Sequence, residues 1–225
     1  MARILLLETS TSNCSVSLAH DGRVVYTIEQ AEQNYVHAEK LHVFITSVLQ
    51  KSGIQAPELD AIAVSSGPGS YTGLRIGVSA AKGLCFALQK PLIVVDTLTA
   101  LAGHAIQLVP EGEMFIPMID ARRMEVYLAM FNNQLDKMTD TSAVVLNEDF
   151  FESISDRHIV LCGDGASKCR HMITGRYDLI DNLPSAAMMA TIAEDKFNHS
   201  KFEDVAYFEP FYLKEYLPGI AKKQA

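Results

Sequence analysis

The chain has 225 residues, of which 48% are hydrophobic and 20% are charged, a composition typical of a globular protein. Its net charge of −8 argues against a protein that grips nucleic acid by itself, because such proteins usually carry a basic surface. The segment Leu74–Leu88 is apolar, but it is too short and too charged to span a membrane, and the N-terminus lacks a signal-peptide pattern. Four cysteines without Cys-x-x-Cys spacing favour reduced thiols, so we expect a cytoplasmic protein with no membrane contact.

The first fifty residues have the patterns of three strands and a helix. An apolar run predicts a buried first strand, and the Asp21-Gly22 turn joins two further strands as a hairpin. Apolar residues then recur at helical spacing. The predicted elements are strands over Ile4–Leu7, Cys14–Ala19 and Arg23–Ile28 and a helix over Tyr35–Lys51.

A glycine-rich loop joins a predicted strand over Asp60–Val64 to a predicted helix over Thr72–Leu88. Such a loop turns the chain, and the helix start that follows it can hold an anion. It is not a Walker A loop, because no Gly-Lys pair follows at the required spacing. The helix contains several glycines and alanines, which indicates that another backbone approaches closely. The segment is interpreted as a ligand loop, a docking helix or both, with a tight turn that binds nothing as the alternative.

The second half of the chain repeats the plan of the first. A strand over Leu92–Val95 and a helix over Thr97–Leu108 precede a predicted junction near Pro110. Each half then begins with a strand that ends at an acidic residue, Glu8 or Asp120, followed by a polar loop, a strand and a turn. This repetition predicts two tandem subdomains, residues 1–109 and residues 110–225, of which the second is smaller. Later in the second half, a strand over Ile159–Cys162 enters Gly163-Asp164-Gly165, while Arg123–Phe131 is predicted as a strand and Asp204–Leu213 as a last strand or docking segment.

Five motifs occur in an order that resembles one known family. They are Glu8-Thr9-Ser10, Asn13-Cys14-Ser15, the Asp21-Gly22 hairpin, Gly67-Pro68-Gly69-Ser70-Tyr71-Thr72-Gly73-Leu74-Arg75-Ile76-Gly77 and Ile119-Asp120-Ala121-Arg122. Together they resemble the bacterial TsaB family, also called YeaZ. The resemblance implies an α/β protein with the actin-like ATPase fold (ASKHA), built of two tandem ribonuclease-H-like subdomains with the second reduced.

The resemblance also implies a function and partners. TsaB-like proteins serve in making N6-threonylcarbamoyladenosine (t6A) at adenosine 37 of tRNA, together with a larger paralogue, TsaD, which performs the transfer, and the ATPase TsaE. The implied role is that of a non-catalytic partner and activator of a TsaD-like transferase. The chain would then contact tRNA only through the complex and form a homodimer when alone.

The paralogue supplies an expectation about metal. In TsaD-like proteins the strand after the glycine helix leads into metal-binding histidines, and this alignment places Thr97 and Leu101 at those two positions. Neither side chain replaces an imidazole ligand, so no metal site is expected.

Actin-like ATPases place acidic residues such as Glu8 and Asp120 opposite phosphates and magnesium. The residues that the resemblance implies as remnants of such a site are Glu8, Thr9, Ser10, Asp120, Gly163 and Gly165. No cofactor is expected to be required, and ATP or ADP at the partner interface remains open. No catalytic residue is assigned, because the sequence shows no nucleophile constellation. The alternatives are an ATP-dependent enzyme of the same fold, an ATPase or a transferase, and a metal-independent peptidase, which is an older family label.

The expected partner surface lies on the helices over Tyr35–Lys51 and Thr72–Leu88, as the resemblance implies. The second of these helices has small residues on more than one side, so one side can pack on the sheet while another meets a partner. The candidate interface residues are Val36, Lys40, Val43, Gly73, Arg75, Gly77, Ala80, Ala81 and Leu84.

Overall fold

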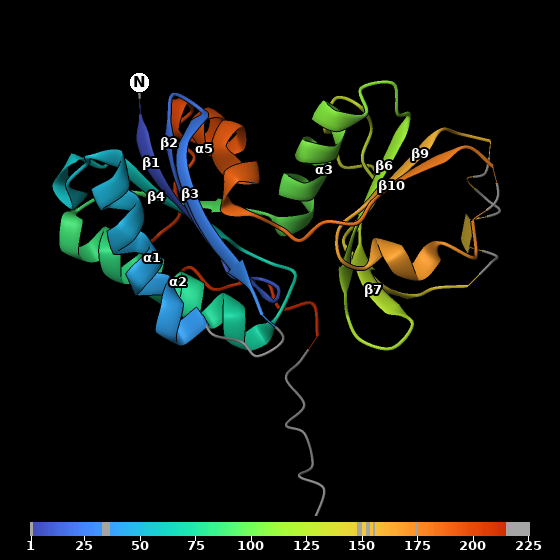
Figure 1. The fold of residues 1–225 in the computed structure, drawn as a ribbon, viewed down its shortest axis with the longest axis horizontal. Coiled ribbons are helices and arrows are strands. Elements are labelled where there is room, and N and C mark those ends of the chain that lie inside the picture. The colour runs from blue at the N-terminus through green and yellow to red at the C-terminus, as the bar shows by residue number, and fades with distance from the viewer. Residues whose placement is uncertain are drawn as a thin grey trace, which may run out of the picture.

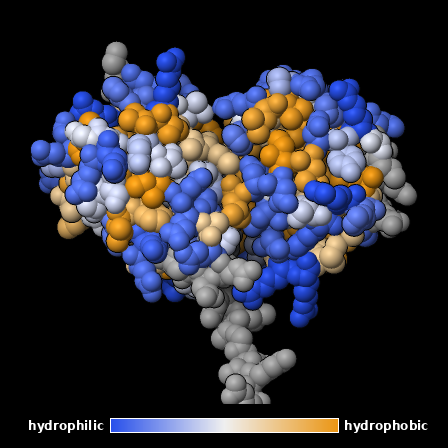
Figure 2. Space-filling model, viewed as in Figure 1, coloured by the Kyte–Doolittle hydropathy of each residue, from blue (hydrophilic) through white to orange (hydrophobic). Residues whose placement is uncertain are grey.

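A computed structural model describes residues 2–32, 37–147, 150–151, 154, 156–173 and 175–214 of the chain. It forms two lobes, each built on a five-stranded sheet, and its surface is hollowed between them (Figures 1 and 2). No helix among the described residues has the length and apolar character needed to cross a membrane.

The first sheet has the strand order β3-β2-β1-β4-β5. Its antiparallel part is β1–β2–β3 and its parallel part is β1–β4–β5, so the sheet is mixed. Its strands are β1 (Arg3–Glu8), β2 (Asn13–His20), β3 (Arg23–Ala31), β4 (Ala61–Ser65) and β5 (Leu92–Val95).

The second sheet has the order β10-β9-β6-β7-β8 and repeats the pattern of parallel and antiparallel neighbours. This repetition confirms the two tandem sheets expected from the strand–acid–loop–strand plan. The second sheet has as many strands as the first, but four of them contain only four residues. Its strands are β6 (Met114–Asp120), β7 (Glu125–Leu128), β8 (Ser142–Val145), β9 (Ile159–Cys162) and β10 (Tyr177–Ile180).

Helices cover both faces of the first sheet because β1 is apolar on both sides. Leu5 and Leu7 belong to the core beneath α1 (His37–Ser52) and α2 (Tyr71–Leu88), whereas Ile4 and Leu6 belong to the core on the opposite face. That second core includes the short helix η3 (Ala186–Met189) and α5 (Ala190–Asn198). Residues after 185 therefore complete the first lobe, and the boundary at residue 109/110 stays a prediction.

Helix α3 (Thr97–Leu108) lies between the lobes (Figure 1). Ala100 packs with the first lobe, whereas Leu101 and Ala105 pack with the second sheet around Phe115. Asp96 caps the helix, since its Oδ1 accepts a hydrogen bond from the Thr99 N–H at 2.7 Å. The observed bounds of α3 are those that the sequence predicts.

Candidate functional site

The glycine loop packs against the loop between β1 and β2 of the same chain. A Cβ atom added at Gly69 would lie 2.4 Å from the Ser10 carbonyl oxygen, and one at Gly73 would lie 2.1 Å from the Thr9 carbonyl oxygen. One at Gly77 would lie 2.2 Å from Thr9 Oγ1. The Thr9 hydroxyl also donates a hydrogen bond to the Gly73 carbonyl at 2.8 Å. Internal close packing therefore accounts for these three glycines.

Glu8 lies inside the first lobe, at the end of β1, and has no exposed surface. Its Oε1 accepts hydrogen bonds from the Ser10 N–H at 2.6 Å and from Ser65 Oγ at 2.9 Å. No described residue hydrogen-bonds to Oε2, and burial raises the pKa of the Glu8 carboxyl. Glu8 and Thr9 are not among the residues that line the cleft between the lobes.

A cleft of about 740 Å³ separates the lobes. Ser10 and Ser70 line it from the first lobe, and Asp120 and Asp164 line it from the second. The structure thus places Ser10 and Asp120, two of the residues implied by the resemblance, on opposite walls of one cleft.

On the second wall, the Gly163-Asp164-Gly165 turn contacts the end of β6. The Asp120 N–H donates to Asp164 Oδ1 at 3.0 Å, and Asp120 Oδ1 accepts from Lys168 Nζ at 2.6 Å. Burial raises the pKa of Asp164 to about 6. Gly163 has φ of +98°, and a Cβ there would lie 2.2 Å from the Met118 carbonyl oxygen, so the turn requires glycine at this position.

The C-terminal segment also contributes to the cleft. The Phe211 N–H donates to the Ser66 carbonyl at 2.7 Å, which fixes the segment beside the glycine loop. Tyr212 packs on Tyr71 with ring centroids 4.7 Å apart, and Lys214 pairs with Glu125 of the second lobe. Sequence reasoning predicted a strand or docking segment here. It could not predict these contacts, because no local pattern indicates that Tyr212 pairs with Tyr71 or Lys214 with Glu125.

The candidate interface residues fall into two groups. Those buried within the first lobe are Gly73, Gly77, Ala80 and Ala81. Val43 and Arg75 are exposed, Lys40 and Leu84 are half-buried, and Val36 lies outside the described residues. Sequence reasoning missed Phe86, which is 83% exposed on α2. It could have been found, because Phe86 is apolar and does not lie on the helix face that contains the buried Val78 and Cys85.

Thr97 and Leu101 are both completely buried. The Thr97 N–H donates to the Gly67 carbonyl at 2.9 Å, and Leu101 belongs to the core between α3 and the second sheet. Within the described ranges, no group of three or more His, Cys, Asp or Glu side chains is placed to hold a metal ion.

Comparison with known proteins gives consistent matches. A family model described as "TsaD: tRNA N6-adenosine threonylcarbamoyltransferase" matches residues 29–210. The tRNA threonylcarbamoyladenosine biosynthesis protein TsaB of Escherichia coli (strain K12) is 31% identical over 223 residues, which cover 94% of each chain. TsaB of Haemophilus influenzae is 38% identical over 126 residues, so this match spans 56% of the present chain and about half (52%) of that relative.

Among solved structures, YeaZ from Pseudomonas aeruginosa has a TM-score of 0.78 at 30% identity and covers 95% of this chain and 100% of that one. The two mixed sheets form the actin-like ATPase fold, as expected. These matches extend over most of the chain, in both lobes. The chain belongs to the TsaB (YeaZ) family.

Proposed function

We propose that this protein acts in N6-threonylcarbamoyladenosine biosynthesis on tRNA, as a non-catalytic partner and activator of a TsaD-like transferase. The names of the TsaB relatives and the match to the TsaD family model support the pathway. One observation carries the non-catalytic role: Thr97 and Leu101, at the positions of the paralogue's metal histidines, are completely buried and serve packing. Neither side chain reaches the surface, where a substrate could meet it.

The structure does not fit a complete magnesium–nucleotide site of the actin-like type. Glu8, the acid expected to face the phosphates from the first lobe, has no exposed surface and does not line the cleft. Asp120 remains on the cleft wall, but its carboxylate is paired with Lys168. These two observations support the proposal that the activator requires no nucleotide for a step of its own.

The proposed docking surface is the outer face of α1 and α2, defined by Val43, Arg75 and Phe86. Val43 is 57% exposed and Phe86 is 83% exposed, and large apolar side chains left in water favour a partner contact. Arg75 is exposed on the first turns of the same helix, with its guanidinium 4.9 Å from the Tyr71 ring centroid. When no TsaD-like partner is present, the same surface is proposed to pair with a second copy of the chain.

The wider assembly is proposed to include a TsaE-like ATPase, with tRNA held by the complex rather than by this chain. The net charge of −8 supports this division, since a polyanion gains little from an acidic surface.

The test is reconstitution of tRNA modification with the TsaD-like enzyme, in the presence and absence of this chain. We expect t6A, measured by mass spectrometry of tRNA nucleosides, to form far faster with the chain present. The Val43→Ser/Phe86→Ser variant should fail to bind the enzyme and fail to stimulate it. Val145→Ser is the matched control for the valine change, because Val145 is 67% exposed on β8 of the other lobe.

Two outcomes would overturn the proposal. The first is an equal rate of t6A formation without the chain. The second is ATP hydrolysis by the isolated chain that Asp120→Asn abolishes, which would favour the ATP-dependent enzyme instead.

A further inference from the structure

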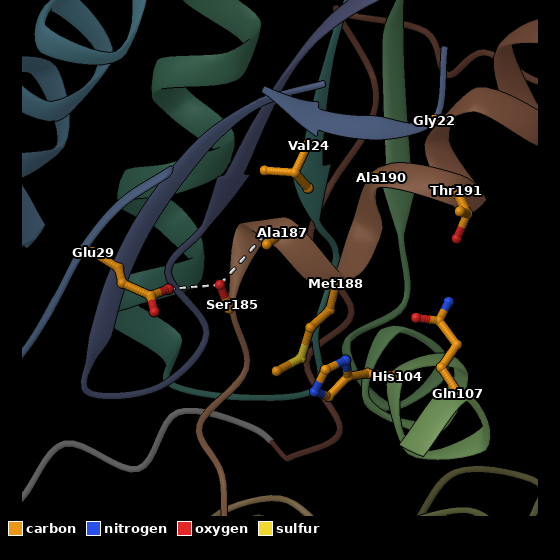
Figure 3. A pocket seen from close by; sticks show the side chains of 10 residues that line it. All are labelled: Gly22, Val24, Glu29, His104, Gln107, Ser185, Ala187, Met188, Ala190 and Thr191. Atoms are coloured by element: carbon orange, nitrogen blue, oxygen red, sulfur yellow. Dashed lines mark hydrogen bonds between the residues drawn. The ribbon is translucent and has the colours of Figure 1, made fainter. Parts of the chain in front are cut away.

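A second pocket, of about 330 Å³, lies between the β2–β3 hairpin, α3 and the η3–α5 layer (Figure 3). It shares no lining residue with the cleft that contains Asp120 and is remote from the proposed docking surface. Its volume is at the lower end of the range for small-molecule sites. Nothing in the proposed function uses it.

One wall of the pocket carries a carboxylate held firmly in position. Glu29 Oε2 accepts hydrogen bonds from Ser185 Oγ at 2.6 Å, from Ser15 Oγ at 2.9 Å and from Asn13 Nδ2 at 3.4 Å. Figure 3 shows the first of these bonds as a dashed line between Glu29 and Ser185. In the described part of the chain, no lysine or arginine forms an ion pair with Glu29. The carboxylate is thus oriented but lacks a counter-charge.

The opposite wall is formed by α3. His104 and Gln107 project from this helix toward the space that Met188 and Val24 border (Figure 3). Burial lowers the pKa of His104, so its ring is neutral near pH 7 and can accept or donate a hydrogen bond. No described residue hydrogen-bonds to the side chain of His104 or Gln107, which leaves both able to bind a ligand.

We propose that this pocket binds a small organic amine, whose ammonium or guanidinium group pairs with Glu29 while its apolar body packs on Met188 and Val24. A polar group at the far end of such a ligand would meet His104 and Gln107. Glu29 is the only formally charged side chain among the lining residues, so the pocket selects a cation over an anion. A bound amine would link the first sheet to α3, the helix between the lobes.

The test is an NMR titration of the full ¹⁵N-labelled chain with three probes of similar size: n-butylammonium, n-butanol and butyrate, at one ionic strength. We expect n-butylammonium to shift the amide signals of Gly22 and Ala187, which line the pocket. Its affinity should exceed that of n-butanol by at least about tenfold, the change that one charge-assisted hydrogen bond produces. Butyrate should not bind.

Two variants locate the effect. Glu29→Gln keeps the size of the side chain but removes its charge, and Ala187→Leu fills the pocket without changing its charge. Each should weaken n-butylammonium binding by about tenfold or more. Glu39→Gln is the matched control, because Glu39 is exposed on α1, across the sheet from the pocket, and its loss should change nothing.

The proposal is overturned if n-butanol binds as tightly as n-butylammonium, or if Glu29→Gln leaves the affinity unchanged. Absence of shifts at Gly22 and Ala187 at tens of millimolar probe would also overturn it. Each variant must give the same circular dichroism spectrum as the wild type, so that a loss of binding can be assigned to the altered pocket and not to unfolding.

Discussion

Glu8 places a carboxyl group in the interior of the first lobe, where Oε1 has two hydrogen-bond donors and Oε2 has none among the described residues. Burial raises its pKa above the ordinary value of 4.5, so the folded state binds a proton more tightly than the unfolded state. The protonated carboxyl makes its full contribution to the free energy of unfolding below about pH 4.5. This contribution is lost as the pH rises through the folded pKa.

We therefore expect Glu8→Gln to raise the free energy of unfolding at pH 8 by about 1 kcal/mol or more, the cost of a poorly satisfied buried charge. At pH 4 the two proteins should differ little. Urea unfolding at both pH values measures this, and the comparison with wild type cancels the contribution of Asp164, whose pKa is also raised. Lower stability of the variant at pH 8 would mean that the ionised carboxylate has a partner in solution.

Two glycines of α2 should respond oppositely to alanine. At Gly77 the new methyl group would lie 2.2 Å from Thr9 Oγ1, so Gly77→Ala should cost about 1–3 kcal/mol through overpacking. At Gly83 nothing lies within 4 Å, and Gly83→Ala should gain about 0.5–1 kcal/mol from helix propensity. Thermal unfolding measures both, and equal effects would contradict the close approach of Thr9 to α2.

At the scale of elements, the helix caps can be ranked. Asp96 Oδ1 accepts bonds from the Thr99 N–H at 2.7 Å and from Thr99 Oγ1 at 2.8 Å, whereas Ser70 Oγ accepts one bond from the Gly73 N–H at 3.3 Å. Because the Asp96 cap is charged and shorter, Asp96→Ala should cost about 1–2 kcal/mol and Ser70→Ala about 0.5–1 kcal/mol. The midpoints of urea unfolding of the two variants measure these losses. A larger loss of stability for Ser70→Ala than for Asp96→Ala would show that these contacts do not set the stability of α3 and α2.

Elements with strong local signals were predicted well. The Asp21-Gly22 turn fixes the hairpin of β2 and β3, and the small-residue pattern gives α2 to within one residue. The strand predicted over Arg123–Phe131 was too long, because Arg123 has φ of +52° and the continuous strand β7 covers only Glu125–Leu128. Phe131 pairs with Phe115 as an isolated bridge. The short strands β8 and β10 escaped prediction, since each has only four residues and is only partly buried.

The candidate site was only partly predictable for a similar reason. Asp120 and the Gly163–Gly165 turn do meet, because the carboxyl ends of parallel strands share one edge of a sheet. The burial of Glu8 depends on Ser65, 57 residues away, and the cleft wall formed by Tyr212 depends on Tyr71. Neither contact has a local sequence signal.

At the scale of the whole molecule, the first lobe is discontinuous in sequence, because α5 covers the Ile4 and Leu6 face of its sheet. A fragment of residues 1–109 would expose that face to water. We expect it to bind the dye ANS and to unfold without a cooperative transition, unlike the full chain. A fragment that unfolds cooperatively at the full-length midpoint would instead support an autonomous subdomain with the predicted boundary.

The position of α5 has a consequence for synthesis on the ribosome, where the N-terminus emerges first. The strands of the first sheet leave the exit tunnel long before Ala190–Asn198 does. The strands of the second sheet are also made before this helix, since β10 ends at Ile180. The first lobe is therefore the first to begin folding but the last to be completed. The Ile4 and Leu6 face of its sheet stays exposed to water and to chaperones through most of translation.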